Sequence, residues 1–285
     1  MALIEFKNVY FQYANSEKFA VEDISLSISE GEFVLITGPS GCGKTTICRA
    51  MNGLVPHFHK GKMKGEVIVD GLKTTEHEVS KLATKVGLVF QNPENQLVAL
   101  NVEREIAFGP ENLGLPPEEI RKRVEDAISL VGIEKIRHRA PYEISGGQQQ
   151  LVALASVISL NPKVLVLDEP TAHLDPKAAR MVLKIVKKLN NELGTTIVLV
   201  EHRLDLSIQY ATRMILMDKG KIVLDGSPRD ILTTDITASI GVGEPKVVQL
   251  FKALQKHGVR LPVPLTPEEA GNYLKEMIKQ HDNNL

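Results

Sequence analysis

A glycine-rich loop between an apolar run and a helical run constrains the fold of this chain more than any other feature. The loop reads Gly38-Pro39-Ser40-Gly41-Cys42-Gly43-Lys44-Thr45-Thr46 and fits the pattern G-x-x-x-x-G-K-[ST]. The mostly apolar residues 32–37 predict a buried strand before it, and residues 45–52 predict a helix that Gly53 ends. A strand, a loop of this kind and a helix in this order predict an α/β fold with a phosphate site.

Each residue type in the loop suits a nucleotide phosphate. Glycines let the backbone N–H groups turn inward, and the start of the helix adds a favourable dipole. Lys44 is expected to hold the β- and γ-phosphates, the Thr45 hydroxyl to bind Mg²⁺, and Thr46 to donate a further hydrogen bond to phosphate. The loop therefore predicts ATP and Mg²⁺ as cofactors, against the alternative of a glycine-rich turn that happens to contain Lys-Thr.

Two acids follow the fully apolar residues 164–167, which predict a buried parallel strand. Such a strand delivers the side chains after it to the edge of the sheet where ligands bind. Asp168 is predicted to hold Mg²⁺, through water, and Glu169 to act as the general base for the attacking water.

Two polar residues are expected at the same edge of the sheet. His202 comes just after the predicted strand 196–200, and a contact with the γ-phosphate is favoured over a structural histidine. Gln91 follows the apolar residues 86–90 in the same way and is predicted to reach both the metal and the water.

The segment Ser145-Gly146-Gly147-Gln148 precedes a predicted helix over residues 149–160 and would expose N–H groups to an anion. With this segment, residues 1–235 resemble the ATP-binding-cassette (ABC) ATPases. The resemblance implies that the segment caps the γ-phosphate of an ATP held by a second subunit. It also implies that Asp175 couples the two sites, although His173 beside it replaces a small residue. Tyr13 matches the aromatic that stacks on adenine, with ordinary strand packing as the alternative.

Shorter segments, residues 90–96 and 108–114, are similar to the energy-coupling-factor (ECF) transporter ATPases. This similarity implies an ATP-hydrolysing subunit of an importer for a vitamin or a transition-metal ion, peripheral on the cytoplasmic face of the membrane. Its implied partners are a second ATPase chain, identical or a related paralogue, an integral membrane scaffold subunit and a substrate-binding membrane subunit.

Composition supports a protein that does not bind nucleic acid. The net charge of the 285 residues is −1, Trp is absent and aromatic residues make up 5% of the chain, so a basic patch or a stacking platform is not expected. Both cysteines, Cys42 and Cys48, lie in or just after the loop and are expected to be reduced thiols. No run approaches the 18 apolar residues of a membrane span, so a membrane role would need a partner.

The predicted fold class is α/β, a P-loop NTPase core of the ABC type with four parts. Residues 1–30 alternate as antiparallel strands of a small sheet, residues 31–91 and 163–235 form the core, and residues 92–162 form an inserted helical subdomain. Residues 236–285 form a short helical tail with two amphipathic stripes, predicted as a dimer contact or, alternatively, as packing on the same chain.

The helical subdomain would carry Ser145 and touch the membrane partner. Val102, Ile106 and Phe108 are the candidate contact residues, with burial in the subdomain's own core an equal alternative.

Two other functions are weighed. A soluble ABC ATPase acting on DNA or ribosomes would carry a long coiled-coil insertion or two cassettes, whereas 99 residues separate Thr45 from Ser145 here. A nucleotide-binding regulator without catalysis would not need Glu169, Gln91 and His202 together.

Overall fold

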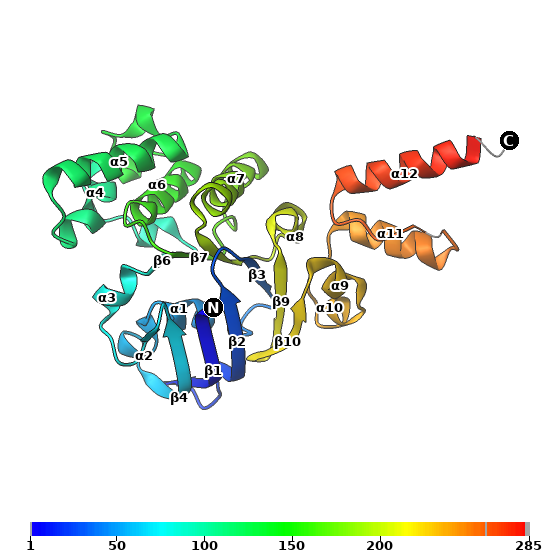
Figure 1. The fold of residues 1–285 in the computed structure, drawn as a ribbon, viewed down its shortest axis with the longest axis horizontal. Coiled ribbons are helices and arrows are strands. Elements are labelled where there is room, and N and C mark those ends of the chain that lie inside the picture. The colour runs from blue at the N-terminus through cyan, green and yellow to red at the C-terminus, as the bar shows by residue number, and fades with distance from the viewer. Residues whose placement is uncertain (1, 260, 283–285) are drawn as a thin grey trace.

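Two sheets form the framework of the chain, as shown by a computed structural model that describes residues 2–259 and 261–282 (Figure 1). The larger sheet has six strands in the order β10-β9-β3-β8-β7-β6. Its strands are β3 (Phe33–Thr37), β6 (Val86–Val89), β7 (Val164–Asp168), β8 (Thr196–Val200), β9 (Arg213–Asp218) and β10 (Lys221–Gly226). All pair in parallel except β10, which is antiparallel to β9. Strands β3, β6, β7 and β8 are buried along their whole length, which explains why their sequences are apolar without alternation.

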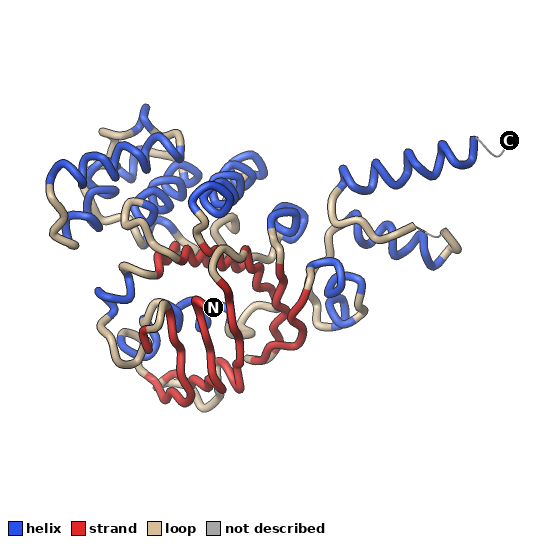
Figure 2. The backbone as a smooth tube through the Cα atoms, viewed as in Figure 1, coloured by secondary structure: helices blue, strands red, loops and turns tan. Residues whose placement is uncertain are grey.

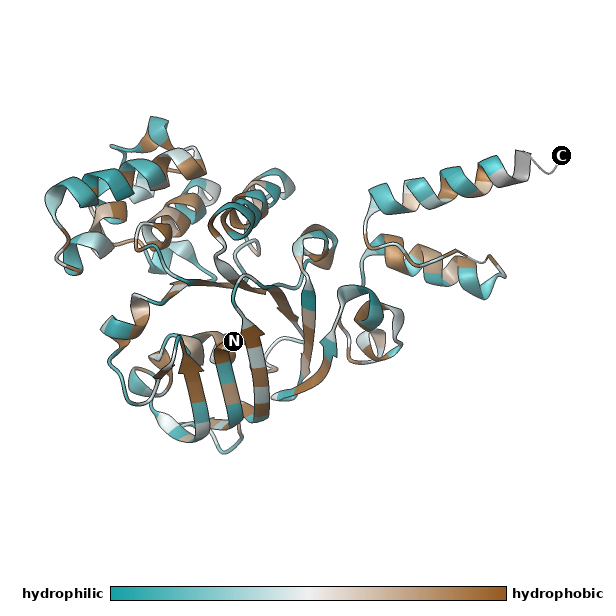
Figure 3. Cartoon of the chain, in the orientation of Figure 1, coloured by the Kyte–Doolittle hydropathy of each residue, from teal (hydrophilic) through white to brown (hydrophobic). Residues whose placement is uncertain are grey.

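The smaller sheet is antiparallel, with strands in the order β2-β1-β4-β5. Its strands are β1 (Ala2–Tyr13), β2 (Val21–Ser29), β4 (Gly61–Val69) and β5 (Leu72–Lys73). Alternate residues of β2 are buried and exposed, a striping that is visible along the strand in Figure 3. The antiparallel strands predicted within residues 1–30 are confirmed. The assignment of all of residues 31–91 to the core was wrong, because β4 pairs with β1 and β5 pairs with β4 in the small sheet. The turn between β4 and β5 contains Asp70 and Gly71, both of which have positive φ.

Helices lie above the sheets and to either side of them in Figure 2, where the strands of the small sheet form the lower edge. Those of the core are α1 (Lys44–Met51), α2 (Leu54–His57), α3 (Val79–Ala83), α7 (Pro176–Leu193), α8 (Leu204–Ser207), α9 (Pro228–Thr233) and α10 (Ile236–Ser239), with a 3-10 turn at Ile208–Tyr210. Helix α1 packs against both β4 and β7, so the apolar side of the small sheet and one face of the large sheet share a buried cluster around it. The loop that precedes α1 is thereby fixed to both sheets.

Residues 92–162 form a separate group of helices, at the upper left of Figure 1. They are α4 (Val102–Asn112), α5 (Pro117–Val131) and α6 (Gly146–Ile158), with 3-10 turns at Pro93–Asn95, Glu134–Ile136 and Pro141–Glu143. The three helices pack on one another. Val102 and Ile106 are fully buried there, so their predicted contact with a membrane partner was wrong, whereas the Phe108 side chain is 50% exposed.

Helices α11 (Lys246–Lys256) and α12 (Pro267–Asp282) project from the end of the molecule that carries α9 and α10 (Figure 1). On α11, Val247 packs against the cluster that contains the core of the large sheet and Phe251 is 1% exposed, so part of the predicted apolar stripe packs on the same chain. Leu250 on α11 and Ile278 on α12 are more than half exposed. At the start of α12, Thr266 Oγ1 accepts a hydrogen bond from the Glu269 N–H at 3.2 Å. The tail's last three residues lie outside the described chain.

Candidate nucleotide site

The glycine-rich loop connects β3 to α1, as the sequence predicts, and its lysine folds back onto it. The Lys44 side chain is buried, and Nζ donates hydrogen bonds to the carbonyl oxygens of Gly38 and Pro39, both at 2.9 Å. The Cys42 Sγ lies 3.8 Å from the same Nζ, and burial raises the pKa of this thiol. The loop therefore holds the Lys44 ammonium group at its centre, where this group can bind a phosphate.

Glycine is required at the end of the loop. Gly43 caps α1 in a left-handed conformation with φ 106°, and a Cβ there would lie 2.5 Å from the Ala20 carbonyl oxygen and 2.9 Å from Val21 Cγ1. Gly41 also has positive φ, 76°, but a Cβ there would meet nothing within 4 Å. The turn at Gly43 is thus tight because the β1–β2 connection passes directly behind it.

A cavity of about 380 Å³ opens over the loop and gathers most of the predicted site. Its lining residues are Tyr13, Ala20, Ser40, Gly41, Gly43, Lys44, Thr45, Thr46, Gln91, Glu169 and His202. These residues come from the end of β1, from the loop and α1, and from the segments that follow β6, β7 and β8. Only Ala20 in this set was missed by the sequence reasoning, and nothing in its residue type could have indicated it.

A magnesium ion fits the residues at the base of this site. Asp168, the last residue of β7, is 5% exposed, and its Oδ1 has no hydrogen-bond partner among the described residues. Burial raises the pKa of the Asp168 carboxyl, and the neighbouring Thr45 hydroxyl opposes that shift. The described chain holds no group of three or more His, Cys, Asp or Glu side chains able to bind a metal. Besides Asp168, Thr45 and the predicted Gln91, a Mg²⁺ would take ligands from phosphate and water, as this ion commonly does.

The side chains of Gln91 and His202 both contact the Glu169 carboxylate. Gln91 Nε2 lies 2.9 Å from Glu169 Oε2, and His202 Nε2 lies 3.0 Å from Glu169 Oε1. Glu169 itself has φ 52°, an unusual left-handed conformation for a residue with a side chain. Both carboxylate oxygens are therefore oriented by neighbours, and the group that the sequence predicts as the base is held at the mouth of the cavity.

The segment of residues 145–148 does not line the loop cavity. Ser145 caps α6, accepting a hydrogen bond from the Gln148 N–H at 3.4 Å, while Gln148 Oε1 accepts one from the Ser145 N–H at 3.0 Å. This capping role of Gln148 was missed, although the S-x-x-Q spacing is its signature. Ser145, Gly146, Gly147 and Gln148 line a separate cavity of about 560 Å³ that also includes Asp175.

Asp175 caps the next helix. Its carboxylate accepts hydrogen bonds from the N–H groups of Lys177 and Ala178 at 2.8 and 3.1 Å, and the backbone N–H groups of Ala178 and Lys177 lower its pKa. Asp175 and the α6 start therefore form one surface, distinct from the loop cavity of the same chain.

Tyr13 lines the loop cavity but is also packed within its own sheet. Its hydroxyl lies 3.1 Å from Thr46 Oγ1, and its ring meets the Phe11 ring edge-on at 4.8 Å. These contacts fit the packing alternative. Because Tyr13 also lines the cavity, its predicted contact with adenine stays a prediction.

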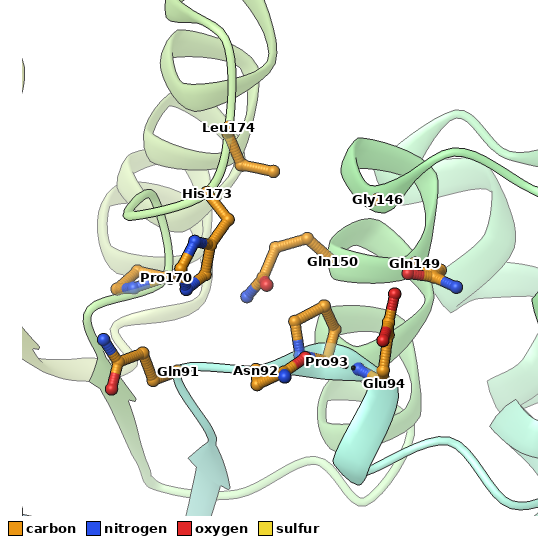
Figure 4. A pocket seen from close by; sticks show the side chains of 10 residues that line it. All are labelled: Gln91, Asn92, Pro93, Glu94, Gly146, Gln149, Gln150, Pro170, His173 and Leu174. Carbon is orange, nitrogen blue, oxygen red and sulfur yellow. Dashed lines mark hydrogen bonds between the residues drawn. The ribbon is translucent and has the colours of Figure 1, made fainter.

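A smaller cavity of about 190 Å³ lies beside the site, between the segment after β6, the start of α6 and the loop after β7. Figure 4 shows Gln91, Gln150 and His173 around it, with Gln150 pointing inward from α6. Gln150 is 1% exposed, and its Nε2 has no hydrogen-bond partner among the described residues. The loop after β7 therefore borders open space on this side.

Comparison with known proteins identifies the family of the chain. The family model described as ABC transporter matches residues 21–172. A putative ABC transporter ATP-binding protein of Pyrococcus horikoshii is 46% identical over 276 residues, which is 96% of this chain and 97% of that protein. The energy-coupling factor transporter ATP-binding protein EcfA1 of Clostridium perfringens is 43% identical over 263 residues, 90% of this chain and 92% of the relative. The chain spans less than half the length of some other relatives.

Solved structures show the same fold. CbiO1 of Clostridium perfringens, described as part of the ABC transporter complex cbiONQ, superimposes with a TM-score of 0.74 at 31% identity, covering 88% of this chain and 99% of that one. The ATP-binding cassette MJ0796, a dimer bound to ADP and Pi, gives a TM-score of 0.70 at 32% identity, covering 79% and 98%.

The chain belongs to the ABC transporter ATPase family. Its predicted fold class is confirmed, and it is an ATPase subunit of a transporter, similar to those of the ECF type. In the described part of the chain, no helix has the length and apolar character needed to cross a membrane.

Proposed function

We propose that this chain is the ATP-hydrolysing subunit of an ECF-type importer that drives uptake of a vitamin or a transition-metal ion through membrane partners. The observation that carries the proposal is the meeting of Gln91 and His202 on the Glu169 carboxylate, above the lysine-containing loop. The EcfA1 and CbiO1 likenesses support the importer class. The importer class would place the chain on the cytoplasmic face of the membrane, held there by its partners.

The residues of the loop cavity divide the reaction among them. Lys44 and the loop N–H groups bind the phosphates. Thr45, Gln91 and Asp168 would hold Mg²⁺, which would supply positive charge to the phosphate oxygens. Glu169 accepts the proton of the attacking water as that water adds to the γ-phosphorus and the bond to the ADP oxygen breaks. His202 orients Glu169 and the γ-phosphate, and Tyr13 packs against the adenine.

A second ATPase chain, identical or paralogous, completes each site. Ser145 and the N–H groups at the start of α6 face a different cavity from Lys44, so one chain alone does not present them to the same phosphate. Facing two chains head to tail would bring the α6 start of one to the loop of the other, with two ATPs between them. The dimeric state of MJ0796 supports this arrangement.

An apolar surface beside Gln91 supports docking of an integral membrane scaffold subunit. The exposed side chains Val98, Leu100 and Tyr142 lie near a groove of about 580 Å³ that Leu97 and Ala99 also line. Residues 97–100 of this surface lie on the segment that leads away from Gln91, so a scaffold helix seated on it would move Gln91 relative to Glu169. A third subunit in the membrane would bind the solute.

The assigned base is tested by Glu169→Gln in the purified full-length chain. The variant is expected to bind ATP, to lose turnover, and to accumulate as a closed, ATP-bound dimer on size-exclusion chromatography. Retained turnover would reject Glu169 as the base.

The importer class is tested by tagging the chain and purifying it from native membranes in mild detergent. Recovery of a multi-spanning scaffold together with a small integral membrane protein is expected, and the small protein would identify the solute. Recovery of soluble partners alone would contradict the importer while leaving the ATPase chemistry intact.

A further inference from the structure

Glu201 is a buried carboxylate that does not line the loop cavity. It lies between β8 and His202, is 1% exposed, and burial raises the pKa of its carboxyl. Its Oε1 accepts hydrogen bonds from the Thr171 N–H at 3.0 Å and the Thr171 hydroxyl at 2.6 Å, and its Oε2 accepts one from the His202 N–H at 3.2 Å. Three donors on one carboxylate are the arrangement that makes a buried acid tolerable.

Arg203 holds the same loop from the other side of His202. Its Nη1 donates hydrogen bonds to the carbonyl oxygens of Thr171 at 3.3 Å and Leu174 at 3.0 Å. The N–H, the hydroxyl and the carbonyl of Thr171 are thus all engaged by the two residues that flank His202 in sequence. The loop of residues 170–174, which separates Glu169 from Asp175, is thereby tied to the segment that carries His202.

Leu174 packs against the buried cluster of the large sheet, but a cavity also borders this loop. Pro170, His173 and Leu174 border the cavity of about 190 Å³, and Gln91 and Gln150 lie across it (Figure 4). A loop with a cavity on one face can shift into it unless hydrogen bonds on the other face prevent the movement. Those hydrogen bonds are the ones from Glu201 and Arg203.

Glu169, immediately before this loop, needs such support. Its φ of 52° is a left-handed conformation that is unfavourable for a residue with a side chain and persists where the surroundings over-determine it. Its own N–H bonds to the Val200 carbonyl at 3.0 Å, and its carbonyl accepts from the Ala172 N–H at 3.2 Å. The first bond joins it to the end of β8, and the second to the tied loop.

We propose that Glu201 and Arg203 are positioning residues for ATP hydrolysis, which hold the 170–174 loop so that the Glu169 carboxylate stays in register with His202. The proposal rests on the assignment of Glu169 as the base. It assigns the role to the reaction step rather than to ATP binding, because neither residue lines the loop cavity.

The test compares Thr171→Val with Thr171→Ser in the full-length chain. Valine keeps the shape and the backbone N–H but removes the hydroxyl that donates to Glu201, whereas serine keeps it. Loss of this charge-assisted hydrogen bond is expected to lower kcat roughly tenfold in Thr171→Val, with KM for ATP within about twofold. Thr171→Ser is expected to stay within about twofold of the parent in both constants.

A kcat within about twofold of the parent in folded Thr171→Val would overturn the proposal, as would a rise in KM at unchanged kcat. A variant that only melts earlier, with unchanged turnover well below its melting temperature, would also overturn it. Should Thr171→Val not fold, Arg203→Met removes the opposite hydrogen bonds and is judged by the same two constants.

Glu169→Gln is measured in parallel. Turnover retained in that variant rejects the base, and the positioning role with it, whereas turnover lost there but kept in Thr171→Val rejects the positioning role alone.

Discussion

Gly43→Ala should destabilise the chain more than the matched Gly41→Ala, although both change a glycine of the same loop. Both positions have positive φ, 106° and 76°, so each alanine carries the left-handed cost of about 1–2 kcal/mol. At Gly43 the new methyl would also lie 2.5 Å from the Ala20 carbonyl oxygen, whereas at Gly41 it meets nothing within 4 Å.

The obstruction at Gly43 cannot move easily. The Ala20 N–H is bonded to the Phe11 carbonyl at 2.8 Å, so a shift of this strand connection disturbs the small sheet. Overpacking of this kind adds about 1–3 kcal/mol, which gives a total of about 2–5 kcal/mol for Gly43→Ala. For a chain of this size about 1 kcal/mol lowers Tm by about 2 °C. We therefore expect a fall of about 4–10 °C for Gly43→Ala and about 2–4 °C for Gly41→Ala.

The assay is thermal unfolding followed by circular dichroism, without nucleotide, because a bound ligand would add stability to whichever variant still binds it. Equal Tm values for the two variants would refute the reasoning, since they would show that the close approach of Ala20 carries no cost. A larger fall for Gly41→Ala would refute it more strongly.

Asp70→Asn should lower stability by roughly 0.5–2 kcal/mol, because Asp70 joins the turn of the small sheet to Lys163 and Lys85 at 2.8 and 2.9 Å. The Lys163 and Lys85 hydrogen bonds lower the Asp70 pKa, so this stability is present above the unfolded pKa and lost as the pH falls through the folded one. Urea titrations at pH 7 and pH 3 should show a smaller parent–variant difference at the lower pH. Leu250→Glu, on the exposed face of α11, should weaken dimer formation in sedimentation velocity if the tail is a subunit contact, and an unchanged association would assign the tail to packing within one chain. Phe108→Glu should leave ATP turnover of the isolated chain unchanged but reduce co-purification of membrane partners, and full recovery of those partners would reject Phe108 as a contact residue for the membrane partner.

The sequence was sufficient for the elements whose pattern is local. The apolar runs of β3, β7 and β8 predict buried parallel strands because such strands alone are apolar on both faces, and the residues after them then had to share an edge. Gln91, Glu169 and His202 were predicted as neighbours for that reason, and the structure joins them at one carboxylate.

What could not be predicted depends on contacts between distant segments. The hairpin of β4 and β5 has strand character, but its choice of sheet depends on pairing with β1, some 60 residues earlier. Val102 and Ile106 carry the apolar side chains of a docking surface and of a helix core alike, and packing decided between the two. Glu201 gave one signal, a charge directly after a buried strand, but its partner Thr171 is 30 residues away.

The order of strands in the large sheet places some site residues after central strands and one, Gln91, after an edge strand. The glycine-rich loop, Glu169 and His202 follow β3, β7 and β8, each paired on both sides, whereas Gln91 follows β6, which pairs with β7 alone. Only the β6–β7 hydrogen bonds resist a displacement of β6 relative to the strand that precedes Glu169, among the strands that the structure describes. A displacement of the helices after β6 would therefore move Gln91 more easily than the residues that follow β3, β7 and β8.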